Sequence, residues 1–398
     1  MNMKRTALLI VASGAFVMAT PARAPACLWD FDTLRMEARA FPGIAEVLTG
    51  RFERNPPRYY EMRLERVAKE LETSPDRLEF YDDAGVACDR LGRPDDAIKW
   101  MEHKRSALDR MKAAHGDAPE LTDHEYRYHA NLGTFYAHRW FKGGASREDL
   151  HDLRRAEAEV ARAIEVNPDA HFGREKYQLA AIRWAIELPP REDAYPPTML
   201  DRFNKPGTDE LEIDHDEAIR GLSGLIVLGN AWESVDVTWA LGAVAGARGD
   251  ASIQLLAKLR LRELIDAGRS SLHPEFTDLP YMSLRGEGIG GQPWSHLQSD
   301  VESYFARARK AADQWHEKRW AFMEARFDSG LHPDTHTDFW KGWNDRPRAP
   351  SLPNTHGFLN SMNITIVGGA LASPIVLFVG IRRWRKRVRS QRMARTMA

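Results

Sequence analysis

Cysteine is scarce in this sequence, and so are the motifs of familiar catalytic sites. Only Cys27 and Cys88 occur among 398 residues, too few for a disulfide scaffold or a four-thiolate zinc site, and no C-x-x-C-H haem attachment motif is present. The motifs G-x-S-x-G, G-x-x-x-x-G-K-S/T and H-E-x-x-H are also absent. We therefore expect no resident metal, no other cofactor and no enzymatic activity. A helical enzyme with an unrecognised active site is the alternative.

Acidic residues are missing from both ends of the chain, although the total charge is nearly balanced at 56 basic and 57 acidic residues. The first 26 residues carry three bases and the last 42 carry eight. Residues 27–356 therefore hold a formal charge of −12. Like-charge repulsion should exclude nucleic acid from such a surface.

The N-terminus has the order of a secretory signal. Lys4 and Arg5 precede an uncharged apolar run over residues 7–19, and small residues follow up to Ala26. This order predicts that residues 1–26 are a signal peptide that is cleaved before Cys27. Three states of Cys27 remain open: a free thiol, a disulfide with Cys88, or a lipidated N-terminus.

The C-terminal region has no Asp, Glu, Lys or Arg between Ala349 and Ile381, and residues 364–381 are almost wholly apolar. At about 1.5 Å per residue, this run is roughly 27 Å long, which is just enough for a bilayer core. We predict a transmembrane helix over residues 358–381 and, from the arginines that follow, a basic cytoplasmic tail over 382–398. Small residues four apart in the span leave a homodimer through this helix open.

Residues 27–330 show helical apolar spacing almost throughout, interrupted by frequent glycine and proline stops. Alternating strand patterns are hard to find, so we predict an all-α extracytoplasmic domain built from helical hairpins. Further helices are expected near residues 57–71, 172–186, 216–228 and 295–327.

Three of the expected hairpins share a pattern. Residues 75–108 contain Tyr81, Ala84-Gly85, Cys88, Leu91-Gly92 and Ala97-Ile98. Residues 125–168 contain Leu132-Gly133, Ala163-Ile164 and Asn167-Pro168, with an insertion between the two helices, and residues 232–267 contain Leu241-Gly242. This pattern resembles the tetratricopeptide repeat (TPR) of bacterial secreted and membrane-anchored proteins. The resemblance implies a solenoid whose first helices line a concave, protein-binding surface.

The resemblance places particular side chains on that surface. They are Glu79, Asp82 and Asp89 from the first repeat, with Arg127 and His138 from the second. Some TPR proteins clamp a terminal carboxylate with lysines and asparagines at such positions. Because Asp82 and Asp89 stand there instead, we expect both acids to face solvent and the ligand to be a basic or polar protein or peptide.

The segment 51–60 concentrates arginine and aromatic side chains beside a double proline. Arg54, Arg58 and Tyr59 are candidate binding residues because arginine and tyrosine are frequent in binding hot spots. The alternative is that the rings cap the first helix pair while the arginines face water.

Two other features have structural interpretations. We expect residues 331–357, which include His332 and Asp334, to form a solvated proline-rich linker to the membrane. Cys88 would be a small buried residue of the first repeat if it is not paired with Cys27. The whole pattern predicts a single-pass bacterial membrane protein with a periplasmic scaffold domain that assembles or binds other proteins.

Overall fold

The computed structural model describes residues 28–30, 32–33, 42–116, 118–168, 173–188, 198–200, 214–274, 276, 295–344 and 350–352. In these residues there are eleven α-helices and no strand, which confirms the all-α prediction. None of the described helices is long and apolar enough to cross a membrane. The predicted signal peptide, Cys27 and the predicted span 358–381 lie outside the described residues.

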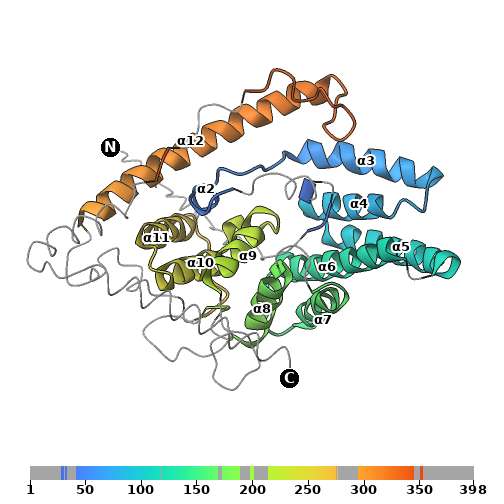
Figure 1. The fold of residues 1–398 in the computed structure, drawn as a ribbon, viewed down its shortest axis with the longest axis horizontal. Helices are drawn as coiled ribbons and strands as arrows, with labels where there is room; N and C mark the ends of the chain where they lie inside the picture. The colour runs from blue at the N-terminus through green and yellow to red at the C-terminus, as the bar shows by residue number, and fades with distance from the viewer. Residues whose placement is uncertain are drawn as a thin grey trace, which may run out of the picture. The chain divides into compact units, whose positions relative to one another are not determined.

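Helical hairpins occur at the three predicted repeats (Figure 1). They are α4 (Leu78–Arg90) with α5 (Pro94–His115), α6 (Pro119–Lys142) with α7 (His151–Val166), and α10 (Val235–Ala247) with α11 (Ala251–Asp266). Gly92 and Gly249 adopt φ values of 71° and 84°, so each allows a tight left-handed turn between two helices. Pro94 and Pro119 start helices at positions that need no backbone N–H donor.

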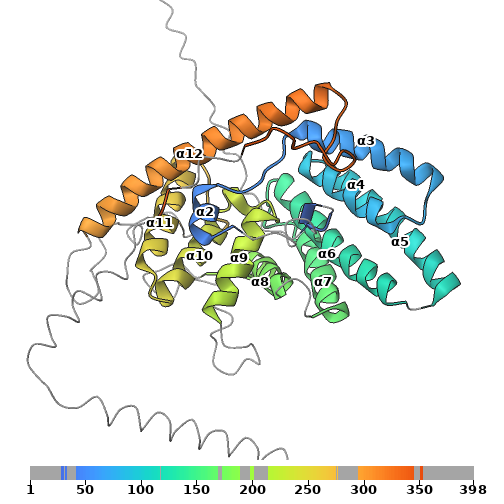
Figure 2. The same ribbon diagram turned by 45° about the horizontal axis from the view of Figure 1, so that its top comes forward.

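The other described elements fill the chain between and around these hairpins. They are α2 (Ile44–Thr49), α3 (Pro57–Thr73), α8 (Arg174–Glu187), α9 (His215–Val227), the 3₁₀ helix η3 (Ala231–Glu233) and α12 (Ser295–Asp328). From α3 onwards, every helix packs against the next one in the chain, up to α11 against α12 (Figures 1 and 2). Helix α2 packs against α9 and α11.

Gly85, Gly133 and Gly242 lie where a helix closely approaches a neighbouring helix. A Cβ atom at Gly133 would lie 2.7 Å from Val160 of α7, and one at Gly242 would lie 2.9 Å from Ala257 of α11. At Gly85 it would meet Met101 of α5 at 3.0 Å and Phe135 of α6 at 3.0 Å. These positions therefore need glycine for helix packing.

Helix α12 packs against helices from both ends of this series. Its 34 residues correspond to about 51 Å of helix, and it contacts α2, α3 and α11 (Figure 1). In a linear repeat array each unit contacts only its neighbours. The α12 contacts therefore add a bridge between helices that are far apart in the sequence.

Candidate binding site

The predicted inner-face residues of the first two hairpins lie close together, but the acids are buried. Asp82 and Asp89 are only 2% and 6% exposed. Asp89 Oδ1 lies 2.7 Å from His138 Nδ1, and Lys104 Nζ donates to both Asp82 oxygens at 2.6 and 2.7 Å. The expectation that both acids face solvent is therefore wrong, because α5 and α6 supply them with buried partners.

Burial and pairing act in opposite directions on the Asp82–Lys104 pair. Burial raises the pKa of Asp82 and lowers the pKa of Lys104, while the attraction between the two groups opposes both shifts. The TPR pattern has alanine where this chain has Lys104. That single departure provides the cation that keeps Asp82 inside the helical array.

Glu79 and Arg127 are less buried than the two aspartates. Glu79 is paired with Arg77 at the surface, and Arg127 pairs with Asp123 on its own helix while its guanidinium lies 5.9 Å from the Trp29 ring centre. Neither side chain lines the open cavity described below. Their predicted role in partner binding stays a prediction.

The chain's own N-terminal segment covers the inner face of α6, which the sequence did not indicate. Asn131 is fully buried and makes two hydrogen bonds with the backbone of Trp29. Its Oδ1 accepts from Trp29 N at 2.7 Å, and its Nδ2 donates to Trp29 O at 3.0 Å. The Trp29 ring packs edge-on against Tyr126, with ring centres 5.6 Å apart, and Arg174 lies over it at 5.2 Å. Asn131 of α6 thus binds the backbone of an N-terminal segment of the same chain.

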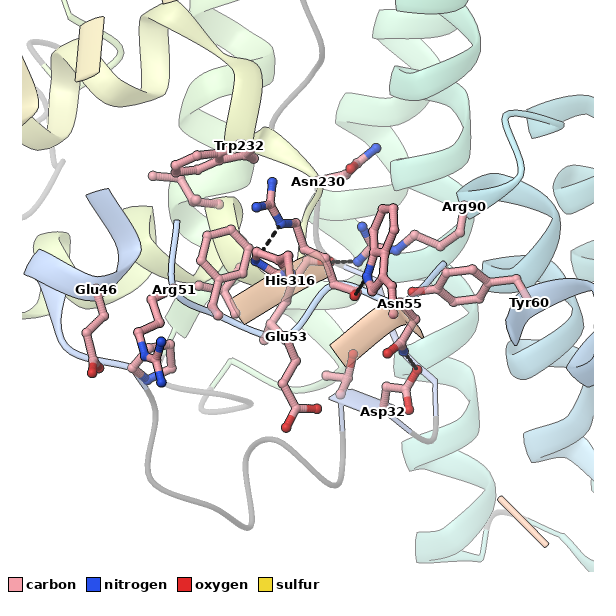
Figure 3. Close-up of a pocket in the computed structure, with 18 of the residues that line it drawn as sticks. Asp32, Glu46, Arg51, Glu53, Asn55, Tyr60, Arg90, Asn230, Trp232 and His316 are labelled. Carbon is pink, nitrogen blue, oxygen red and sulfur yellow. Dashed lines mark hydrogen bonds between the residues drawn. The ribbon is translucent and has the colours of Figure 1, made fainter. Parts of the chain in front are cut away.

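An open cavity of about 690 Å³ lies beside this segment. It is lined by the segments before α3, the link from α9 to η3, and α12. Figure 3 shows Trp232 and Asn230 on one side, Asp32 and Glu53 on the opposite side, and His316 between them. We call it the Trp232 cavity. Its size falls within the roughly 300–1,000 Å³ that is usual for ligand pockets.

Three arginines surround the indole of Trp232. The guanidinium carbons of Arg260, Arg54 and Arg309 lie 3.5, 5.1 and 5.4 Å from its ring centre. Phe52 packs edge-on against the same ring, with centres 5.4 Å apart. Cation–π contacts of this kind stabilise the indole, but they also gather positive charge at one side of the cavity.

Arg54 forms no ion pair with a carboxylate of the described residues, although Asp313 and Glu233 partly offset its charge. Its Nε lies 3.3 Å from His316 Nε2, and burial together with Arg309 and Arg260 lowers the pKa of Arg54 to about 10. Burial and the nearby arginines lower the pKa of His316 to about 3, so this imidazole is neutral at pH 7. His316 therefore provides no negative charge to balance Arg54.

No protein-family model, no curated protein and no solved structure matches this chain. The function must accordingly be argued from the geometry and chemistry of the site itself.

The candidate residues of segment 51–60 lie in three different environments. Arg54 lines the Trp232 cavity, whereas Arg58 does not, and pairs with Glu324 at 3.3 Å and Asp328 at 2.6 Å on α12. Tyr59 is buried and donates its hydroxyl hydrogen to Asp32 at 2.5 Å. The interpretation that all arginines of this segment face water is wrong for Arg54, which is half-buried in the cavity wall.

Arg63 is a fully buried cation that ties distant parts of the chain together. It pairs with Asp30 at 3.0 Å, Asp32 at 3.1 Å and Asp334 at 2.7 Å. Burial alone would raise the pKa of Asp334, but Arg63 lowers it to about 2. The Asp334 carboxylate is therefore ionised at neutral pH and provides countercharge for Arg63.

The expectation of a solvated linker is wrong for His332, Asp334 and Phe339, although other residues of 331–344 are exposed. His332 and Asp334 are both buried, and the His332 ring stacks on Tyr59 with centres 4.6 Å apart. Phe339 is fully buried against Phe327 of α12. The polar composition of this stretch suggests a solvated segment, but His332 and Asp334 are partners of α3.

Cys88 is a buried, free cysteine, and burial raises the pKa of its thiol to about 11. This agrees with its interpretation as a small buried residue of the first repeat. Its predicted disulfide partner, Cys27, lies outside the described residues. Within the described part of the chain, no group of three His, Cys, Asp or Glu side chains is arranged to hold a metal ion.

Proposed function

We propose that this protein is a TPR-like scaffold that binds a partner protein through the Trp232 cavity. The observation that carries the proposal is the composition of the cavity wall. Trp232, Trp315 and Trp320 line it together with Arg51 and Arg54. Tryptophan and arginine are the residue types that most often dominate protein–protein binding energy.

The exposure of Trp320 supports this proposal further. Among the described residues it is the one large apolar side chain that is exposed, at 38%. Its Nε1 donates to the backbone oxygen of Arg54 at 2.6 Å, which holds the indole at the cavity. A fixed, exposed indole beside a cavity offers contact area that is already ordered before binding.

The helical array provides a rigid frame for such a site. Hairpins that pack on their neighbours, with glycines at the close contacts, are consistent with a TPR-like scaffold. The hydrogen bonds of Asn131 with Trp29 illustrate how the inner face of such an array binds the backbone of another segment. Because the chain's own N-terminal segment occupies that face, the adjacent cavity is the surface left for a partner.

The proposed location is the bacterial cell envelope. Signal peptide 1–26, transmembrane helix 358–381 and basic tail 382–398 would place the helical domain in the periplasm and anchor it to the membrane. The three sequence features agree on one orientation.

Site-specific photo-crosslinking tests the binding proposal. A benzophenone amino acid at position 320 replaces one exposed aromatic ring by another, and in cells it should give one dominant protein adduct. Position 318 is the control: it is exposed on the same helix and faces about 200° away from position 320. Equal adducts from both positions, or none from position 320, would contradict the cavity as the partner site.

Protease accessibility tests the proposed location. In intact spheroplasts, added protease should digest the domain over residues 27–330 and leave an epitope on the tail 382–398 protected. Digestion of the tail alone would reverse the orientation. Recovery of the protein in the soluble fraction would contradict the anchor.

A further inference from the structure

We propose that the Trp232 cavity recognises an acidic segment of the partner protein, whose carboxylates pair with Arg54 and Arg90 while an apolar side chain packs on the tryptophans. This inference rests on the proposed function and specifies the chemistry of the partner. It concerns a surface apart from the inner face of the hairpins. It also reverses the basic ligand that the sequence indicated.

Four of the five acids at the cavity have arginine partners, and the fifth, Glu46, accepts from the backbone N–H of Gly43 at 3.0 Å. Asp30 and Asp32 pair with Arg63, as described above. Glu233 pairs with Arg269 at 2.8 Å, and Glu53 lies 3.3 Å from Arg319. A cationic ligand would have to compete with these fixed arginines, and so gains little from the acids of the wall.

Two arginines of the wall, in contrast, form no ion pair with a carboxylate among the described residues, although Asp313 and Glu233 attract Arg54 and Asp30 attracts Arg90. Arg54 Nε lies 3.3 Å from Nε2 of neutral His316, which is itself 3.0 Å from the backbone oxygen of Gly50, and Arg90 donates to the backbone oxygen of Leu228 at 2.6 Å. Both are only partly exposed and line the cavity. A partly buried charge without a direct ion pair is unfavourable, and an incoming carboxylate would relieve that cost with charge-assisted hydrogen bonds.

Charge near Trp232 strengthens the case for an anion. Burial lowers the pKa of Arg260 to about 10, as it does for Arg54, even though Arg260 pairs with Glu263 at 2.7 Å. Glu263 is shared with Arg309, whose Nε lies 3.0 Å away. Arg309 also pairs with Asp313 at 3.2 Å, so two carboxylates serve two arginines here, and Arg54 is the third cation of the cluster.

The chain's own N-terminal segment provides an internal example of the same chemistry. Asp30 and Asp32 follow Trp29, and the structure binds this acidic and aromatic segment through Arg63 and Arg174. A partner segment of similar character would meet Arg54, Arg90 and the indoles of the cavity. The formal charge of −12 does not prevent this, because surface charges farther away than about 8 Å are screened at physiological ionic strength.

Calorimetric titration of the full-length protein, purified in detergent, tests the inference with two capped tripeptides, Glu-Trp-Glu and its neutral counterpart Gln-Trp-Gln. A pair of charge-assisted hydrogen bonds should make the acidic peptide bind at least about tenfold more tightly. In the double variant Arg54→Gln/Arg90→Gln this preference should fall to about threefold or less.

Arg58→Gln is the matched control, because Arg58 belongs to the same segment but pairs with α12 and does not line the cavity. It should retain the full preference. Arg54→Gln should melt at the same or a higher temperature than the wild type, since burial and neighbouring arginines disfavour its charge. The thermal melt of the double variant is recorded in parallel, so that a lost preference in a folded protein is distinguished from unfolding.

Equal affinity for the two peptides, no binding of either, or an unchanged preference in the double variant would overturn the inference. The outcome is separable from that of the proposed function. If the acidic preference is found but position 320 gives no adduct in cells, the cavity binds acidic groups and the scaffold proposal fails.

Discussion

Lys104 determines how the first hairpin uses Asp82. The TPR pattern has a small residue at this position, and with it Asp82 would have no buried cation. Here the ammonium group is fully buried and donates to both carboxylate oxygens of Asp82, which also accepts from Asn131 at 3.0 Å. The pair therefore connects α5 to α4 and, through Asn131, to α6 and the N-terminal segment.

Lys104→Met should destabilise the protein strongly, because it leaves the Asp82 carboxylate buried without a cation. Removal of one member of a buried ion pair typically costs about 3–5 kcal/mol of unfolding free energy. Urea denaturation measures this loss, and Asp82→Asn in the same chain should recover part of it. Lys99→Met removes an exposed pair with Asp96 and should cost about 0.5 kcal/mol or less. A Lys104→Met variant as stable as Lys99→Met would show that the buried pair does not form.

At the scale of elements, the sequence predicts the helices well because their ends are marked locally. Gly92 with Pro94, and Gly249 with Asp250, stop one helix and start the next within a few residues. Apolar spacing then gives the face that each helix buries. No local pattern predicts that α12 packs on α3, since that contact joins segments more than 200 residues apart.

The cavity could be predicted only in part for the same reason. Composition singled out Arg54 because arginines and rings are concentrated in residues 51–60. Trp232 and His316 come from two distant segments and reach the cavity only through tertiary packing. Asp82 and Asp89 were misjudged because burial depends on neighbouring helices, whereas the repeat pattern gives only a position along one helix.

The glycines of the repeat pattern give a prediction at this scale. Gly133→Ala should cost more stability than Gly85→Ala, within the roughly 1–3 kcal/mol that is typical of overpacking. At Gly133 a Cβ would lie 3.1 Å from two backbone atoms of α7 in addition to Val160, whereas at Gly85 it meets only the ends of Met101 and Phe135 side chains. Side chains can move aside more easily than backbone.

Thermal and urea unfolding of the two variants provide the comparison. Gly92→Ala is not a suitable control because its positive φ strains any other residue. Gly143→Ala is suitable: its Cβ would meet no atom closer than 3.4 Å. If Gly133→Ala and Gly143→Ala melt together, the close contact between α6 and α7 is absent.

For the molecule as a whole, buried titratable groups make stability depend on pH in two directions. His124 and His316 have pKa values lowered to about 3 by burial. Between pH 6.5 and 3 the unfolded chain binds more protons at these sites, so stability falls as the pH falls. Asp30 and Asp236 have pKa values raised to about 6, again by burial. Between pH 6 and about 4 the folded chain binds more protons at these two sites, so their contribution to stability rises as the pH falls.

Variants at the two kinds of site should therefore change the pH dependence with opposite signs. Between pH 7 and pH 5, the unfolding free energy of His316→Gln should decrease by about 1–2 kcal/mol less than that of the wild type. Asp236→Asn should lose more than the wild type over the same interval. Urea unfolding at the two pH values measures both differences. Equal losses in all three proteins would contradict the burial of these groups.

The partners of Arg63 also constrain when the chain can fold. A ribosome that synthesises this protein releases Arg63 long before Asp334, which lies 271 positions later. Repeat arrays in general can fold progressively as each unit emerges. Here, however, Arg63 lacks the Asp334 carboxylate until nearly the whole domain has been made. Translation would thus proceed with an incomplete N-terminal region, and the segment that carries Asp334 would complete the ion cluster around Arg63.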